Sequence, residues 1–174
     1  GTLNQISTAT QTIAFAFDNS GVVNVNSGIL ALSGGGTHAG SFAVNNAAGE
    51  LRFTGGTHTF GAAAFSGLGL VRVNGATLDI GGATSIANPF TLQAGTVTGA
   101  GTLTLDGAFT LGGGTLSGAG ALVTNGTTAV NNGTAILAGR AWNNFGAMTI
   151  NGQLNIANGG VLTNRSAGSV TIPA

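Results

Sequence analysis

Apolar and polar residues alternate along much of the chain, in short runs with a period of two. Examples of these runs are Leu51 and Phe53, Leu78 and Ile80, Phe90 and Leu92, and Leu154 and Ile156. A period of two is that of a β-strand with one buried face, and the runs end after a few residues at Gly or Asn. No window shows the i, i+3, i+4 spacing of an amphipathic helix. The pattern therefore predicts an all-β chain built from short strands.

A repeat of 19 or 20 residues organises these strands. Phe90–Gly107 overlays Phe109–Gly126 at a shift of 19, with ten identities in eighteen positions. The same spacing places a small residue followed by Thr in successive windows, at Thr37, Thr57, Thr77, Thr96, Thr115 and Thr134. Two or three strands per window are typical of a β-solenoid, whose strands pair in parallel about 4.8 Å apart along the axis. We therefore predict a parallel β-helix of about eight or nine coils, with these Thr residues stacked in one ladder.

Positions counted from these Thr residues predict which side chains lie inside. The fourth position before the Thr is apolar in coil after coil: Phe53, Val73, Leu92, Leu111 and Val130. The sixth position before it is also apolar: Leu51, Val71, Phe90 and Phe109. We expect both columns in the core, with Phe90 and Phe109 stacked. The position after the Thr, occupied by His38, His58, Leu78 and then mostly aliphatic residues, is expected to point inward or to line a corner.

The repeat indicates one domain over residues 1–174. Residues 18–172 form the repeat coils, and residues 1–17 are expected to be an N-terminal strand or an assembly segment. The stretch from Ile6 to Phe17 still alternates like a strand, and the chain reaches Pro173 directly after another strand-like run. The end coils of a solenoid carry unpaired backbone groups and an open core. We therefore expect flanking sequence, or another copy of the chain, to cover the ends.

Composition narrows the classes of partner. The chain has 33 Gly, 5% charged residues, no Cys and a formal net charge of zero. Without excess positive charge it lacks the electrostatic attraction that supplies most non-specific nucleic-acid affinity, so no nucleic-acid partner is expected. No stretch approaches the roughly 20 apolar residues of a membrane-spanning helix. The absence of Cys excludes a disulfide framework and a thiolate nucleophile.

Two small groups of residues are candidate sites. His38 and His58 fall in the same predicted column one coil apart, where their imidazoles are expected to stack about 5 Å from each other. Two ligands are too few for a metal site, so a stacked neutral pair at a corner is the favoured interpretation. Arg52 and Arg72 share a predicted outward column, with Glu50 beside them. This group is a candidate for docking an anion or a sugar acid, although a solvated charge cluster is the favoured interpretation.

Other chemistry is less well supported by the sequence. Rows of Thr suggest an ice-binding face, but the second row is irregular, and hydrogen bonding between Thr residues of neighbouring coils is the favoured interpretation. The acids Asp18, Glu50, Asp79 and Asp106 lie in different columns of different coils. A polysaccharide lyase or hydrolase needs clustered acids, so we expect neither catalysis nor a cofactor or bound metal. Glycan platforms favour exposed Trp or Tyr, and Trp142 is the single residue of these types.

The repeat resembles a known class of sequence. GTLTLDGAFTLGGGTLSGAGAL and NSGVVNVNSGILALSGG look like the β-helical exoprotein repeats of bacterial surface and secreted proteins, such as filamentous-haemagglutinin-like proteins and autotransporter passenger domains. The resemblance covers residues 18–172 and implies a right-handed β-helix that is exported to the cell surface or beyond. It further implies a non-catalytic structural scaffold in a surface fibre, acting in adhesion, biofilm or surface coating. The partners then expected are further copies or flanking repeats, with an adhesin segment that binds glycans as the alternative.

Overall fold

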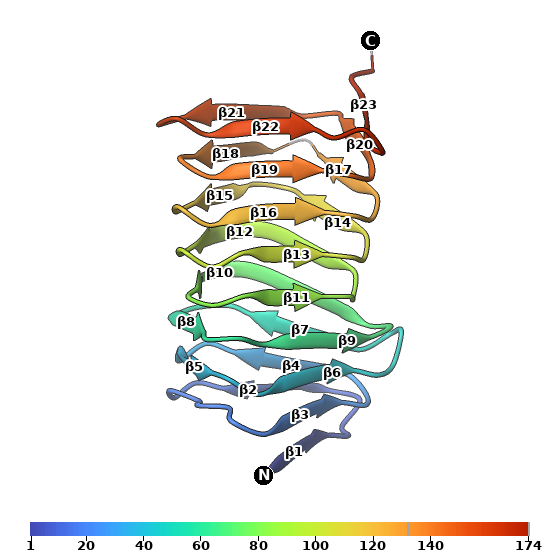
Figure 1. The fold of residues 1–174 in the computed structure, drawn as a ribbon. Helices are drawn as coiled ribbons and strands as arrows, with labels where there is room; N and C mark the ends of the chain where they lie inside the picture. Colours follow the sequence, from blue (N-terminus) through green and yellow to red (C-terminus); the bar gives the residue numbers. More distant parts are fainter. Residues whose placement is uncertain (132, 174) are drawn as a thin grey trace.

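The computed structural model describes residues 1–131 and 133–173, and these residues form a parallel β-solenoid, as predicted (Figure 1). The strands of one coil stack on those of the next, and the two ends of the chain lie at opposite ends of the stack. In Figure 1 the nearer strands run to the right and those behind them run to the left while the chain rises, so the coil is right-handed. No helix occurs in the described range, and so none there could span a membrane.

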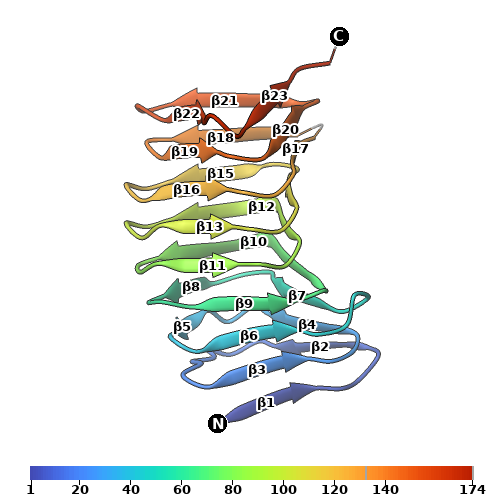
Figure 2. The ribbon, with the colours of Figure 1, turned by 45° about the vertical axis from the view of Figure 1, so that its right-hand side comes forward.

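Each coil contributes up to three strands, which stack into three faces. The first face is a nine-stranded sheet made of β1 (Thr2–Gln5), β3 (Val22–Val25), β6 (Ser41–Val44), β9 (Ala64–Gly67), β11 (Thr84–Ile86), β13 (Leu103–Leu105), β16 (Ala121–Thr124), β19 (Ala141–Asn144) and β22 (Val161–Asn164). The second and third faces are parts of one sheet that bends around the solenoid (Figure 2).

The second face contains β2 (Thr10–Ile13), β4 (Ile29–Leu32), β7 (Glu50–Phe53), β10 (Leu70–Ile80), β12 (Phe90–Thr98), β14 (Phe109–Leu111), β17 (Thr128–Val130), β20 (Ala147–Ile150) and β23 (Ser169–Thr171). The third face contains β5 (Gly36–His38), β8 (Thr57–Phe60), β15 (Gly114–Ser117), β18 (Thr134–Ala138) and β21 (Gln153–Ala157). The long strands β10 and β12 pass round the corner and belong to both of these faces. β10 pairs with β7 at its first end and with β8 at its second. β12 pairs with β14 at its first end and with β15 at its second.

The two predicted core columns are confirmed by the strand register. Phe53 pairs with Val73, and the column continues through Leu92 and Leu111 to Val130. The second column runs from Leu51 through Val71 and Phe90 to Phe109. These side chains are essentially inaccessible to solvent. The Phe90 and Phe109 rings stack with centroids 5.6 Å apart and planes inclined by 26°.

Asparagine side chains of successive coils form hydrogen bonds along the axis. Asn24 Nδ2 donates to Asn4 Oδ1 at 2.8 Å, and Asn45 Nδ2 donates to Asn26 Oδ1 at 2.7 Å. A separate pair lies inside the solenoid near the other end, where Asn144 is fully buried and its Nδ2 donates to Asn164 Oδ1 at 2.9 Å. Coils are thus joined by side-chain amides as well as by the backbone ladders.

Candidate functional site

The predicted Thr ladder is continuous over four residues and shifts at both ends. Thr57 pairs with Thr77, Thr77 with Thr96, and Thr96 with Thr115, all on the outer side of the third face. Thr37 does not join this column, because it pairs with Thr59. Thr134 pairs with Gln153, whereas Ile136 lies over Thr115. The neighbouring outward column contains Thr59, Asp79 and Thr98, so a carboxylate interrupts the hydroxyl groups of this face.

Two histidines lie inside the solenoid at the start of the third face. His38, on β5, and His58, on β8, are both fully buried. Their rings stack with centroids 5.2 Å apart and planes inclined by 16°, close to the predicted spacing. The register differs from the predicted one at His38, which pairs with Phe60, whereas His58 pairs with Leu78 as predicted. The stacking therefore joins residues that are offset by two positions along the strands.

The contact between the two imidazoles is a hydrogen bond. His38 Nε2 lies 3.0 Å from His58 Nδ1, and His58 Nε2 lies 3.2 Å from the carbonyl oxygen of Gly55. Two ring nitrogens bound to one tetrahedral metal ion at about 2.0 Å each would lie about 3.3 Å apart. The 3.0 Å separation in the structure is that of a hydrogen bond, which engages both facing nitrogens. Among the residues that the structure describes, no three His, Asp or Glu side chains gather closely enough to form a metal site.

Burial sets the protonation state of both rings. Desolvation, together with the neighbouring His58, lowers the pKa of His38 from 6.5 to about 4, against a smaller opposing effect of Asp18. Desolvation also lowers the pKa of His58, although backbone carbonyls that accept from its ring partly oppose this. Both rings are therefore neutral at neutral pH, because the apolar surroundings disfavour the charged form.

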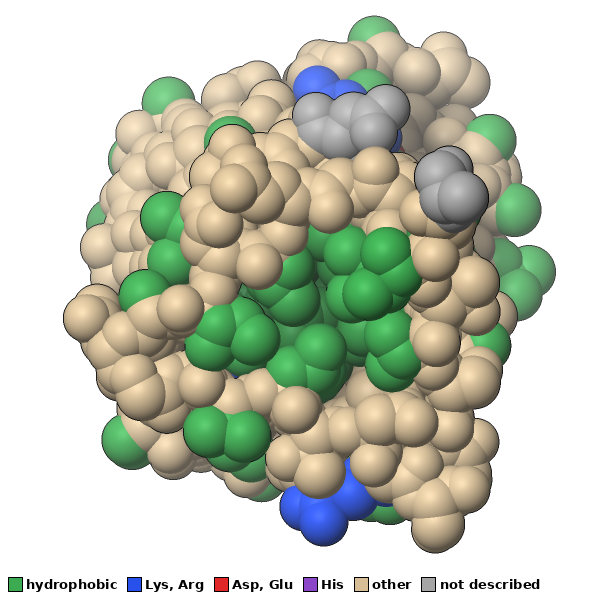
Figure 3. Space-filling model, turned by 90° about the horizontal axis from the view of Figure 1, so that it is seen from above, with side chains coloured by type: hydrophobic (Ala, Val, Ile, Leu, Met, Phe, Trp, Pro, Cys, Tyr) green, Lys and Arg blue, Asp and Glu red, His purple; other side chains and the backbone are tan. Residues whose placement is uncertain are grey.

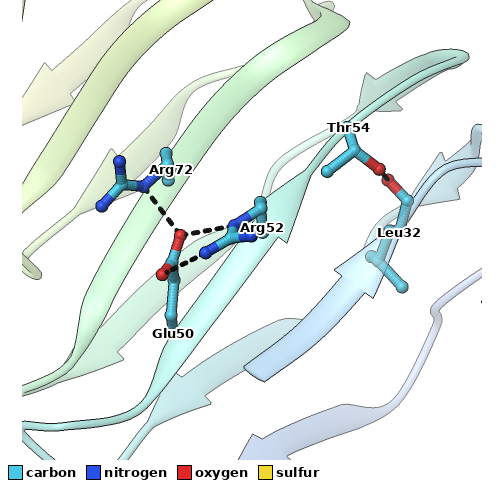
Figure 4. A network of polar contacts seen from close by, with 5 residues as sticks. All are labelled: Leu32, Glu50, Arg52, Thr54 and Arg72. Carbon is cyan, nitrogen blue, oxygen red and sulfur yellow. Dashed lines mark hydrogen bonds and ion pairs between the residues drawn. The ribbon is translucent and has the colours of Figure 1, made fainter. Parts of the chain in front are cut away.

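The second candidate group lies on the outer side of the second face, on β7 and β10 (Figure 4). Arg52 and Arg72 are paired in the strand register, as predicted, and Glu50 lies between their guanidinium groups. Arg52 donates through Nε and Nη2 to the two carboxylate oxygens of Glu50, both at 2.8 Å, and Arg72 Nε donates to Oε1 at 2.8 Å. Burial alone would raise the pKa of Glu50, but these hydrogen bonds and the two positive charges lower it overall.

The Glu50 carboxylate is ionised and bound by both guanidinium groups, which leaves it poorly suited to transfer a proton. The side chain of Arg72 remains 32% exposed, and the bond to Glu50 engages its Nε. The outward part of this guanidinium group can therefore accept an anion from solvent. The group carries a net charge of about one positive unit, which is small for binding a polyanion.

Replacing Glu50 with Gln is expected to lower the free energy of unfolding by about 1–2 kcal/mol, because two guanidinium groups lose their shared carboxylate while remaining partly solvated. Urea denaturation followed by circular dichroism measures this difference. Asp79→Asn, a neutralisation on the outer side of β10, is the matched control and should change the stability by less than about 0.5 kcal/mol. Equal effects of the two variants would contradict a specific role of the Glu50 network.

Two buried residues were not expected from the sequence, and both lie near the C-terminal end. Trp142, the single candidate for an exposed glycan platform, is fully buried, with its ring centroid 5.8 Å from that of Phe109. Its Nε1 donates to Thr124 Oγ1 at 3.0 Å. Arg140 is also fully buried, and within residues 1–131 and 133–173 its guanidinium group donates only to backbone carbonyls. One feature of the sequence indicates that Arg140 is unusual. It stands directly before β19, at the position that Gly120 occupies directly before β16 in the coil below.

The fold assigns the chain to the parallel β-solenoids, a class that includes β-helical repeat proteins. Comparison with family models, with curated proteins and with solved structures finds no match for this chain.

Proposed function

We propose that this chain is a non-catalytic structural scaffold: a β-solenoid segment of a bacterial surface or secreted fibre, located outside the cell. The resemblance of its repeats to β-helical exoprotein repeats supports this location. The proposal is also supported by the continuous stacking of the coils, whose apolar interior runs from Val23 to Met148. Such a stack transmits load along its axis through backbone hydrogen bonds, which is the property a fibre requires.

The observation that carries the proposal is the open apolar core at the C-terminal end. Figure 3 shows this end, where apolar side chains gather at the centre inside a polar rim. Leu137 is fully buried beneath Ile156, whereas Ile156 itself is 52% exposed. In the same way Met148 is buried beneath Val170, which is 38% exposed. Another coil stacked on this end would bury these side chains as the preceding coils are buried.

The N-terminal end of the solenoid also has a hollow in its surface. An open hollow of about 240 Å³ lies between Thr2 and Leu3 on one side and the segment from Phe17 to Gly21 on the other. Ends of this kind form heterologous contacts, in which the top of one unit meets the bottom of the next and the assembly does not close. Flanking repeats of a longer chain or another copy of this chain would supply a further coil at such an end.

Electron microscopy and sedimentation of the purified chain at increasing concentration test self-association through the ends. We expect rods whose length grows with concentration and whose width remains that of one solenoid. Ile156→Asp places a charge inside the open end and should shorten the rods. Thr163→Asp, on the outer side of the same end coil, is the matched control and should leave them unchanged. Monodisperse single particles over the whole concentration range would contradict self-association.

The alternative function is that of an adhesin segment that binds acidic glycans, and the partly exposed guanidinium group of Arg72 favours it. In this proposal a carboxylate or sulfate of the glycan pairs with Arg72, while Glu50 holds the group in position. A glycan array tests the proposal. Binding restricted to acidic glycans and lost in Arg72→Gln would support it, and an array without acidic binders would contradict it.

A further inference from the structure

The His38–His58 pair lies in an aromatic enclosure at the N-terminal end of the third face. The His38 ring has centroid distances of 5.0 Å to Phe60, 5.3 Å to Phe42 and 6.3 Å to Phe17. Both imidazoles are fully buried; the column above His58 continues with Leu78, and the column above His38 continues through Phe60 to Ile80. The chain therefore places two titratable rings where its later coils place apolar side chains.

The hydrogen bonds define where the protons are. A carbonyl oxygen only accepts, so His58 Nε2 carries the proton that it shares with Gly55. In the neutral ring His58 Nδ1 must then be the acceptor, and His38 Nε2 donates to it. His38 Nδ1 is consequently unprotonated, and it is a buried nitrogen with no hydrogen-bond partner in the described structure.

An additional proton has no favourable position in this arrangement. On His38 Nδ1 it would place a charge and an unpaired donor in the aromatic enclosure. On His58 Nδ1 it would remove the acceptor of the hydrogen bond between the rings. The closed structure therefore resists protonation at both rings, whereas an opened segment would expose the rings to water.

The charged groups near the pair are few. The segment before β3 contributes Asp18, whose Oδ1 accepts a hydrogen bond from the Thr37 amide at 2.7 Å and whose charge favours protonation of His38. Strands β5 and β6 contribute no other charged side chain. The charged residues of β7 and β10 occupy outward positions: Glu50, Arg52, Arg72 and Asp79. Asp18 is thus the charged side chain whose effect must be separated from that of the histidines.

Few backbone bonds hold the layer that covers His38. The amides of Phe17 and Asn19 donate to the carbonyls of Gly35 and Thr37, each at 2.9 Å, and Ala39 donates back to Asn19 at 2.9 Å. On its other side β5 pairs with β8. Releasing residues 17–20 together with β5 would therefore expose His38 without disturbing the coils above β8.

We propose that the His38–His58 pair is an acid-sensitive switch: protonation releases residues 17–20 and β5 from the solenoid, while the coils from β13 to β17 remain closed. This inference concerns the N-terminal coils alone and does not rest on the proposed scaffold function. The opened segment would present the exposed edge of β8 and the apolar rings around His38 only in an acidic environment.

The direction of the pH dependence follows from the two protonation equilibria. Folded-state pKa values below the usual 6.5 mean that the opened form binds protons that the closed form does not. The closed form is thus favoured fully above about pH 6.5 and progressively less as the pH falls towards 4. The shift of His38 to about 4 corresponds to about a 300-fold increase in the opening equilibrium. His58 adds to this change.

Hydrogen–deuterium exchange of the whole chain between about pH 7 and pH 4.5 tests the switch, after correction for intrinsic exchange rates. We expect the protection of residues 17–20 and 36–38 to fall by at least about tenfold between pH 6.5 and pH 4.5, with residues 103–130 unchanged. Uniform loss of protection along the chain, or full protection of residues 17–20 and 36–38 at pH 4.5, would overturn the proposal.

A matched pair of variants assigns the effect to the histidines. His38→Phe with His58→Leu introduces the residue types that the register places directly above, Phe60 and Leu78, and should abolish the pH dependence. Asp18→Asn keeps an acceptor for the Thr37 amide and should retain the pH dependence. Acid opening that persists in the histidine double variant, or that is lost in Asp18→Asn, would overturn the proposal.

A measurement on the unmodified chain keeps the test independent of how the variants fold. Nitrogen-15 NMR of the imidazoles should show both rings as neutral Nε2-protonated tautomers at neutral pH. In the closed form His38 should not titrate above about pH 5, and the pKa of His58 should lie below the usual 6.5. A closed-form histidine that titrates near pH 6.5 would contradict the switch.

Discussion

Replacing Gly118 with Ala is expected to lower the free energy of unfolding by about 2–5 kcal/mol. Gly118 lies in the turn between β15 and β16 with φ of +90°, a conformation that a residue with a Cβ adopts at a cost of roughly 1–2 kcal/mol. A Cβ built there would also overlap backbone atoms of Gly99 in the coil below. Relieving this overlap would push two coils apart, which adds about 1–3 kcal/mol. The urea midpoint of the purified variant measures the total.

Gly61→Ala is the matched control for this substitution. Gly61 also lies in a turn, but a Cβ there would meet no atom within 4 Å. We expect this variant to match the unmodified protein, or to be more stable by up to about 1 kcal/mol because the unfolded chain loses entropy. If both variants lose the same stability, close stacking of the turns is not what selects glycine at position 118.

The sequence predicts the architecture well because stacking imposes the same spatial constraint on every coil. Phe90 and Phe109 lie in consecutive coils of equal length, so counting residues from the preceding Thr places them on each other. The alternation of apolar and polar residues then assigns each position to the inside or outside of a strand. For this reason the sequence alone predicts the core columns and the parallel pairing of the strands.

The predicted strand register is wrong where the length of a coil changes, and the error is two residues. His38 pairs with Phe60 instead of His58, and Gly114 pairs with Ala135 instead of Gly133. A shift of one residue would turn every side chain to the other face, whereas a shift of two preserves the buried face. The hydrophobic pattern alone therefore does not distinguish these registers. The stacking of His38 and His58 was predicted, but their hydrogen bond and tautomers depend on this offset.

Arg140 shows a second limit of prediction from sequence, because a charged residue is normally expected at the surface. Its guanidinium group donates through Nε to Ser117 O at 2.6 Å and through Nη1 to Ala121 O at 3.2 Å. Nη2 donates to Gly99 O, two coils below, at 3.2 Å. Burial lowers the pKa of this group, which reflects the cost of removing its charge from water. Three hydrogen bonds to a charged donor offset that cost, at about 1.5–3 kcal/mol each.

We therefore expect Arg140→Ala to lower the free energy of unfolding by about 3–5 kcal/mol, since it removes all three bonds and leaves a buried void. Arg140→Lys should lose nearly as much, because one ammonium group lacks the planar fork that reaches three carbonyls in different directions. Arg140→Met retains most of the volume without a buried charge and should lose only about 1–2 kcal/mol. Urea denaturation of the three variants measures these differences. A loss below about 1 kcal/mol in Arg140→Ala would contradict a stabilising role of the three hydrogen bonds, and a Met variant as unstable as the Ala variant would show that hydrogen bonding, not packing, dominates.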